Sequence, residues 1–85
     1  MKARAHADFW AHFDRLPANI QKQARRKYLL WGENPRHRSL QFKKVRDDIW
    51  SARVTDHYRA MAYQDEDGWV WFWIGTHRDY EKLLK

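Results

Sequence analysis

Residues 69–74, with the sequence WVWFWI, restrict the fold more than any other part of the chain. Three tryptophans alternate there with valine, phenylalanine and isoleucine, so a strand built from them is apolar on both faces. Such strands are typical of the interior of a sheet that is covered above and below. We therefore expect this segment to form an inner strand, with another element beside it on each edge.

Three earlier segments carry apolar residues at a period of two, which predicts strands. They are residues 40–45 (LQFKKV), 49–54 (IWSARV) and 58–63 (YRAMAY), separated by the connections RDD, TDH and QDEDG. The last connection ends in Asp67-Gly68, a common turn signal, and lacks the ligand spacing of a calcium loop, so we interpret it as a turn. These segments and the apolar strand together predict a four-stranded antiparallel meander. The outer edge of its last strand needs a neighbour, and only residues 2–5 (KARA) remain to cover it as a short strand.

Apolar residues at helical spacing predict two N-terminal helices, over residues 9–16 and 20–31, that meet at a proline. Near the other end, Thr76 and Asp79 fit a capping box, which predicts a short C-terminal helix. These patterns predict an α+β fold in a single domain, residues 1–85. Its small antiparallel sheet carries an N-terminal helical hairpin on one face.

The net charge of the chain indicates which class of molecule it binds. Seventeen Lys and Arg against eleven Asp and Glu give a net charge of +6, so a polyanion such as nucleic acid is expected. The chain has no cysteine, which excludes disulfides and thiolate metal sites. No apolar run approaches the roughly 20 residues that span a bilayer, and the N-terminus lacks the apolar segment of a signal peptide. We therefore expect a cytoplasmic protein with no membrane partner.

The TDH turn sets the expected register of the middle strands. If it pairs Val54 with Tyr58, then Arg53 lies directly opposite Arg59. The face toward the helices then holds Leu40, Phe42, Trp50, Ala52, Ala60, Ala62, Val70, Phe72 and Ile74. The other face holds Gln41, Lys43, Ser51, Arg53, Arg59, Met61, Trp71 and Trp73. A five-residue QDEDG turn places Trp73 across from Arg59.

Two arginines directly opposed across a strand pair repel each other. An anion between them relieves that repulsion, and Lys43 adds a third cation on the same face, so an anion site is the preferred interpretation. The alternative is that Asp56 or another carboxylate neutralises the arginines while Trp73 stacks on one guanidinium.

The last strand runs back toward the TDH turn, which contains His57 and precedes Arg59. The end of that strand therefore places His77, Arg78 and Tyr80 close to these two residues. Cations in the first turn of a helix oppose its dipole, and a bound phosphate relieves that mismatch. A neutral imidazole acts as a general base or acid, a tyrosine hydroxyl donates a proton, and arginines stabilise a phosphorane without a metal. The set predicts a ribonuclease site; the alternative is that the tyrosine only packs and the histidine is only solvated.

Two helices followed by LQFKKV, IWSARVTDHYRAMAY and WFWIGTHRDYEKLL resemble the RelE/ParE superfamily of type II toxin–antitoxin toxins over nearly the whole chain. The YRAMAY strand and the closing H-x-x-Y are the specific parts of the resemblance. It implies a small antiparallel sheet with two N-terminal helices on one face. For RelE/YoeB-like members it also implies metal-independent cleavage of messenger RNA in the ribosomal A site, by attack of a ribose 2′-hydroxyl on the adjacent phosphate.

The resemblance implies four catalytic residues: His77, Tyr80, Arg59 and, more loosely, Arg53. Candidate RNA-binding residues are Lys43, Gln41, His57, Trp73 and Arg78. Some members use a glutamate before the first long strand, whereas RHRSLQ offers none here. His77 is therefore the expected general base, with His57 in reserve.

The expected function is that of a ribosome-dependent messenger-RNA endoribonuclease toxin that needs no cofactor or metal and acts on ribosome and mRNA. A cognate antitoxin neutralises it, with an acidic segment expected over Arg53, Arg59 and Trp73. The first alternative is a ParE-like inhibitor of DNA gyrase without nuclease chemistry. The second is a noncatalytic nucleic-acid-binding module, which needs only the charge and the tryptophans.

Overall fold

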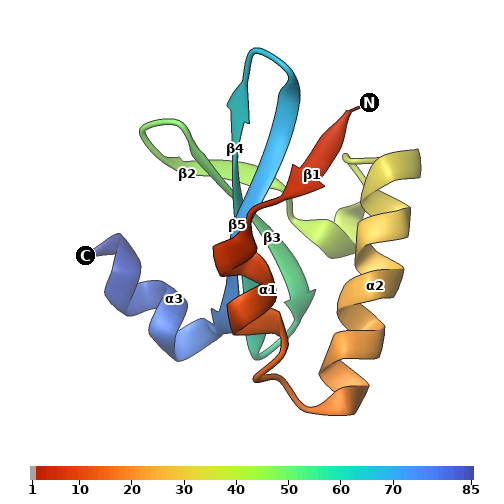
Figure 1. Ribbon diagram of the computed structural model, residues 1–85, viewed down its shortest axis with the longest axis vertical. Helices are drawn as coiled ribbons and strands as arrows, with labels where there is room; N and C mark the ends of the chain where they lie inside the picture. Colours follow the sequence, from red (N-terminus) through yellow and green to blue (C-terminus); the bar gives the residue numbers. More distant parts are fainter. Residues whose placement is uncertain (1) are drawn as a thin grey trace.

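The computed structural model describes residues 2–85, which form one mixed sheet with helices on both of its faces (Figure 1). In chain order the elements are β1 (Ala3–Ala5), α1 (Ala7–Phe13), α2 (Ala18–Glu33), the 3-10 helix η1 (Arg38–Leu40), β2 (Lys43–Arg46), β3 (Ile49–Thr55), β4 (Tyr58–Asp65), β5 (Gly68–Thr76) and α3 (His77–Leu84). The strand order is β1-β5-β4-β3-β2. The predicted α+β class, the helical hairpin and the C-terminal helix are confirmed.

The short strand β1 covers the outer edge of β5, as predicted, and runs parallel to it. Trp69 N–H donates to the carbonyl of Lys2 over 3.0 Å. Gly68 makes this approach possible: its φ is +130°, and a Cβ there would lie 2.4 Å from that carbonyl oxygen. Arg4 also forms an ion pair with Asp65 at 2.6 Å. Because β5 has a neighbour on each edge, its apolar sequence is that of an interior strand.

The two faces of the sheet bury different sets of side chains. Helices α1 and α2 cover one face, where Phe13, Ala24 and Trp31 pack on the alanines of β3 and β4. Helix α3 covers part of the other face, where Tyr80 packs on Met61 and Trp73. None of the helices described over residues 2–85 is long and apolar enough to cross a membrane.

A β-bulge in β5 reverses the alternation of its side chains. Met61 pairs with Trp73 but Ala62 pairs with Trp71, so Phe72 is an extra residue on β5. Trp71 consequently packs with Trp31 under the helices, whereas Phe72 packs with Trp73 on the other face. The predicted faces of Val70, Trp71 and Phe72 were therefore wrong, because one inserted residue moves everything beyond it to the opposite face.

The register between β3 and β4 agrees with the prediction over most of its length. Arg53 lies opposite Arg59, and further in the two strands pair alanine with alanine. At the turn, Thr55 rather than Val54 pairs with Tyr58, because Val54 is an extra residue there. The predicted partner of Arg59 was also wrong. Asp65 pairs with Gly68, so the turn has two residues, Glu66 and Asp67, and not the five predicted. The shorter turn and the β5 bulge together place Gly75, and not Trp73, across from Arg59.

The first predicted strand begins later than expected. Residues 38–40 form η1, and Gln41 follows with a φ of 44°, in the left-handed region. A residue in that conformation ends the local turn and cannot join a β ladder. The strand β2 therefore begins at Lys43, and Gln41 lies outside it.

Candidate functional site

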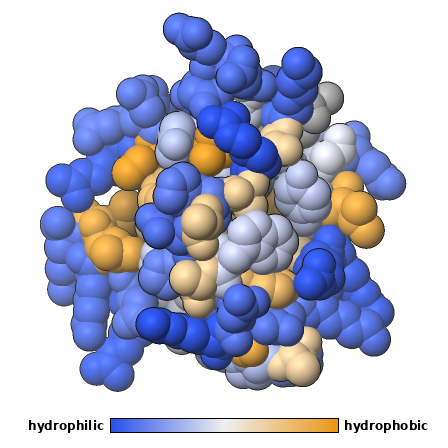
Figure 2. Space-filling view, viewed as in Figure 1, coloured by the Kyte–Doolittle hydropathy of each residue, from blue (hydrophilic) through white to orange (hydrophobic). Residues whose placement is uncertain are grey.

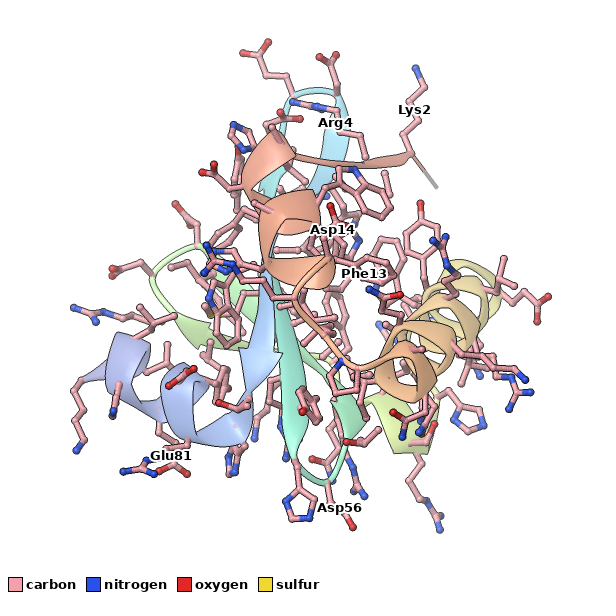
Figure 3. All side chains as sticks on the ribbon, turned by 60° about the horizontal axis from the view of Figure 1, so that its bottom comes forward. Lys2, Arg4, Phe13, Asp14, Asp56 and Glu81 are labelled. Atoms are coloured by element: carbon pink, nitrogen blue, oxygen red, sulfur yellow. The ribbon has the colours of Figure 1, made fainter. Side chains whose placement is uncertain are left out.

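The β3–β4 turn gathers three predicted site residues, Arg53, His57 and Arg59, at one end of the sheet. Nη2 of Arg53 donates a charged hydrogen bond to Oδ1 of Asp56, which lies in the turn itself. Figure 3 shows Asp56 at the same end of the molecule as Glu81 of α3, far from Lys2 and Arg4. For Arg53 the structure therefore shows the alternative interpretation, in which Asp56 neutralises the arginine.

The guanidinium of Arg59 has a different environment from that of Arg53. Its Nη1 donates to the carbonyl oxygens of Thr55 at 2.6 Å and Tyr58 at 3.0 Å, with a longer contact of 3.4 Å to that of Asp56. Burial, and after it the positive charge of Arg53, lower the pKa of Arg59. All three bonds use Nη1, and within the described residues 2–85 neither Nε nor Nη2 helps to hold the turn. A cation with two uncommitted donor nitrogens suits an oxyanion.

The first residue of α3, His77, is anchored to the same turn. Its backbone N–H donates to the carbonyl of His57 over 2.7 Å. The helix starts there because the hydroxyl of Thr76 accepts from the N–H of Asp79 over 3.1 Å, which confirms the predicted N-cap. The backbone thus brings together two histidines from distant parts of the chain.

The imidazole of His77 borders a small hollow beside the turn and pairs with Glu81. The hollow has a volume of about 400 Å³ and is lined by His57, Tyr58, Thr76, His77, Arg78 and Glu81. Nε2 of His77 lies 3.2 Å from Oε1 of Glu81, one helical turn away. Glu81 was not predicted, although the i, i+4 spacing on a predicted helix is the signal that would have revealed it.

Tyr80 is a buried residue of α3. Only 7% of it is exposed, and its hydroxyl donates to Oγ of Ser51 over 3.0 Å. Its ring also stacks on that of His77, with 5.7 Å between centroids. The buried ring of Tyr80 therefore packs against His77 from the interior side. The catalytic role predicted for Tyr80 stays a prediction.

Trp73 is not the exposed stacking surface that the face assignment implied. It is 8% exposed and packs with Tyr80 beneath α3. Its indole lies over Gly75, where an added Cβ would meet Cζ2 of the ring at 2.6 Å. The absence of a side chain at Gly75 therefore lets the indole extend toward the position paired with Arg59.

The remaining predicted RNA-binding residues are exposed and spread over a wider area. Arg78 lies in the first turn of α3 and lines the hollow beside His77. Lys43 pairs at the start of β2 with Ser51, whose hydroxyl accepts from Tyr80, so Lys43 lies on the face that α3 covers. Arg53, predicted on that face, also lines a hollow on the α1–α2 side of the sheet. Gln41 precedes β2 and does not share its ladder. The structure thus brings His57, His77, Arg78 and Arg59 to one end of the sheet, whereas Lys43 and Gln41 lie apart from them.

The chemistry available at this end is proton transfer and stabilisation of negative charge. Each of the two imidazoles can accept or donate a proton, and the guanidiniums supply positive charge and planar donors. Among the described residues 2–85, no group of three or more histidine, aspartate or glutamate side chains could hold a metal ion. The arrangement suits the transfer of a proton beside a phosphate.

Comparison with known proteins adds a family and a fold. Residues 18–82 match the family model of the ParE-like toxin domain. The sequence matches no curated protein. Solved structures that share the fold include the following three.

The first is a RelB–RelE antitoxin–toxin complex from Methanococcus jannaschii, with a TM-score of 0.73 and 12% identity over 95% of this chain and 98% of that one. The second is a YoeB/ParE toxin from Agrobacterium tumefaciens, with a TM-score of 0.71 and 15% identity over 91% of this chain and 99% of that one. The third is the RelBE2 toxin–antitoxin complex from Mycobacterium tuberculosis, with a TM-score of 0.70 and 18% identity over 88% of this chain and 95% of that one. At these identities the likeness establishes the fold alone.

Proposed function

Because this chain belongs to the ParE-like toxin domain family, we propose that it is a toxin that cleaves messenger RNA on the ribosome and that a cognate antitoxin neutralises. The observation that carries the nuclease proposal is the convergence of His77, His57 and Arg59 at the β3–β4 turn. Two imidazoles next to a guanidinium are the groups that metal-independent RNA cleavage requires.

In the proposed reaction His77 is the general base. The contact of its Nε2 with Glu81 favours the tautomer that leaves Nδ1 free to accept a proton. Nδ1 takes the proton of a ribose 2′-hydroxyl, and the 2′-oxygen forms a bond to the adjacent phosphorus. The bond from phosphorus to the 5′-oxygen breaks, and that oxygen takes a proton from His57, which leaves a cyclic phosphate and a 5′-hydroxyl. Arg59 stabilises the negative charge that develops on the phosphoryl oxygens.

The antitoxin part of the proposal is supported by two of the structural neighbours. The structures from Methanococcus jannaschii and Mycobacterium tuberculosis are complexes of a toxin with an antitoxin. This chain covers nearly all of both matched chains. An acidic antitoxin also suits a chain with a net charge of +6.

Inhibition of DNA gyrase is the second candidate function. The observation that favours it is the match of residues 18–82 to the ParE-like toxin domain. Inhibition by binding alone does not use the chemistry of His77. The two functions therefore differ in their response to substitution of this histidine.

The deciding experiment adds the purified protein to a cell-free translation reaction and maps new 5′ ends on the message. We expect cleavage that requires ribosomes, and a loss of about 10²- to 10⁴-fold in the single-turnover rate for His77→Ala, the usual scale for an acid–base group. His37→Ala is the matched control, since His37 is exposed and lies in the segment before β2. Intact message together with inhibited supercoiling by gyrase would support the second candidate instead.

A further inference from the structure

A second hollow lies between α1, α2 and the strands of the sheet. Its volume is about 400 Å³, and its walls include Phe13 of α1, Ala24 and Trp31 of α2, and Trp71 and Ile74 of β5. We call it the α1–α2 hollow. It shares none of its lining with the hollow beside His77. Protein interiors are close-packed, whereas mostly apolar hollows of roughly 300–1,000 Å³ are typical of small-molecule sites.

Two buried donors in the wall of this hollow have no acceptor. Trp31 and Trp71 are 2% and 5% exposed, and among the described residues 2–85 neither indole Nε1 has a hydrogen-bond partner. The two rings meet edge to face, with 5.1 Å between their centroids, so the two indoles lie side by side in the wall. A buried N–H group without an acceptor is costly, and native proteins seldom leave one so.

Water is a poor partner for these two donors. An ordered buried water takes roughly two to four polar partners, whereas the neighbouring wall is formed by Phe13, Ala24 and Ile74, which offer no polar side chain. A ligand fits this wall better if most of its body is apolar and its oxygen atoms lie at one end.

A cation lies one helical turn from the first of these donors. Lys27 and Trp31 are four residues apart on α2 and both line the hollow, so their side chains are neighbours. Burial, and after it the charge of Arg53, lower the pKa of Lys27. Arg25 also lines the hollow, with its guanidinium over the ring of Phe13 at 5.1 Å. Within residues 2–85 neither Lys27 nor Arg25 pairs with a carboxylate. A carboxylate at this point would meet an ammonium group as well as the indole donors.

The mouth of the hollow is apolar and exposed. Trp10 of α1 and Tyr28 and Leu29 of α2 line it, and Leu29 is 66% exposed. In the space-filling view, pale and orange side chains gather over α1 and between α1 and α2, surrounded by hydrophilic ones (Figure 2). A small molecule can therefore enter from solvent. A second copy of this chain, with its net charge of +6, would instead bring more positive charge to Lys27 and Arg25.

We propose that the α1–α2 hollow binds a small organic acid with an apolar body, of the class of medium-chain carboxylates. The apolar body packs among the aromatic and aliphatic side chains of the wall. The carboxylate accepts from the indole N–H groups of Trp31 and Trp71, and Lys27 offsets its negative charge. This binding is independent of the proposed function, because it uses neither His77 nor an antitoxin.

Decanoate is the probe, added to the unaltered protein near neutral pH. In ¹⁵N-labelled protein it should move the indole N–H resonances of Trp31 and Trp71 downfield, because each donor gains an acceptor. Decylammonium has the same chain and the opposite charge, and butyrate has the same carboxylate and a short chain. Both should leave the two resonances in place. Equal shifts with either control, or no shift with decanoate, would overturn the proposal.

Two pairs of matched variants test the hollow itself. Ala24→Leu fills it, and Ala18→Leu makes the same change at the exposed first residue of α2, outside the lining. Lys27→Gln removes the cation beside the indoles, and Lys22→Gln removes an exposed cation of α2 that does not line the hollow. Calorimetric titration should show decanoate affinity at least about tenfold weaker for Ala24→Leu and Lys27→Gln, the scale of a lost charge-assisted hydrogen bond. Each control should stay within about twofold of wild type, since exposed charges contribute little. Equal affinities within each pair would contradict the proposal.

The melting temperature and the oligomeric state complete the test. Ala24→Leu should melt at or above the temperature of wild type, because the added side chain fills an apolar hollow. If Ala24→Leu does not fold, the two lysine variants decide the question. Sedimentation is measured on the protein without ligand. A dimer whose two indole resonances already lie at the downfield positions would show that a second copy fills the hollow, and the proposal would then be wrong.

Discussion

Tyr80 of α3 donates a hydrogen bond to Ser51 of β3 over 3.0 Å, and both residues are buried. This contact joins the C-terminal helix to the middle of the sheet and stacks the phenol against His77. It therefore bears on whether the tyrosine acts in the reaction or holds the histidine in place.

Tyr80→Phe should lower the free energy of unfolding by about 1 kcal/mol, the net value of one buried hydrogen bond. Ser51→Ala should have a similar effect, and the double variant should lose little more than either one, since both remove the same bond. Denaturant titration of the four proteins measures this coupling. A cleavage rate for Tyr80→Phe at least a hundredfold below wild type, without a matching loss of stability, would instead mark the hydroxyl as a proton donor.

Arg59→Gln should reduce stability as well as cleavage. Relief of the repulsion from Arg53 is worth at most about 1 kcal/mol, whereas the substitution removes the two short bonds to the carbonyls of Thr55 and Tyr58. We expect a melting temperature several degrees lower, on the order of 4–8 °C per kcal/mol for a domain of this size. Cleavage should fall by about a hundredfold, the scale of a lost oxyanion donor.

The matched control for Arg59 is Arg26→Gln, which neutralises an exposed arginine on α2. It should change neither the melting temperature nor the cleavage rate by a measurable amount, because exposed charges contribute little. A lower melting temperature for Arg59→Gln together with full cleavage would show that the arginine only holds the turn.

Asp56→Asn should strengthen the binding of phosphate. In the wild type, the carboxylate of Asp56 pairs with Arg53. The substitution removes this carboxylate, so neither Arg53 nor Arg59 then has a carboxylate partner from the turn. A ligand that binds only the folded protein raises its stability by mass action. Added inorganic phosphate should therefore raise the melting temperature of Asp56→Asn more than that of wild type. Asp14→Asn, which changes an exposed aspartate after α1, is the control; an equal phosphate response in all three proteins would exclude an anion site at the arginines.

Stability should depend on pH through Asp65. The hydrogen bond from Arg4 lowers the pKa of Asp65 below its ordinary range. A carboxylate with a depressed pKa in the folded state stabilises the protein above its unfolded pKa of about 3.9, and this stabilisation is lost as the pH falls through the folded pKa. The melting temperatures of wild type and Arg4→Gln should therefore differ by a constant amount at mildly acidic to neutral pH and converge in stronger acid. A difference that persists unchanged into strong acid would show that Arg4 acts through packing instead.

The sequence by itself determined the features that rest on local patterns. The alternating strands predicted Arg53 opposite Arg59, the apolar sequence of residues 69–74 required a neighbour on each edge, and Thr76 marked the start of α3. Side-chain period and capping act over a few residues, so they can be read without knowing what packs on them. The position of His77 beside the β3–β4 turn followed from the same patterns, because the end of β5 has to return to that turn.

The tertiary structure alone decided which of these residues are accessible and what pairs with them. The bulge at Phe72 and the placement of Trp71 beneath α2 depend on how large indoles fill the space between helices and sheet, and one inserted residue reverses the face of all that follow it. The packing of α3 on the sheet buries Trp73 and Tyr80, and a hollow lies on the other face between α1, α2 and the strands. These features depend on packing between elements distant in the chain, which no local period records.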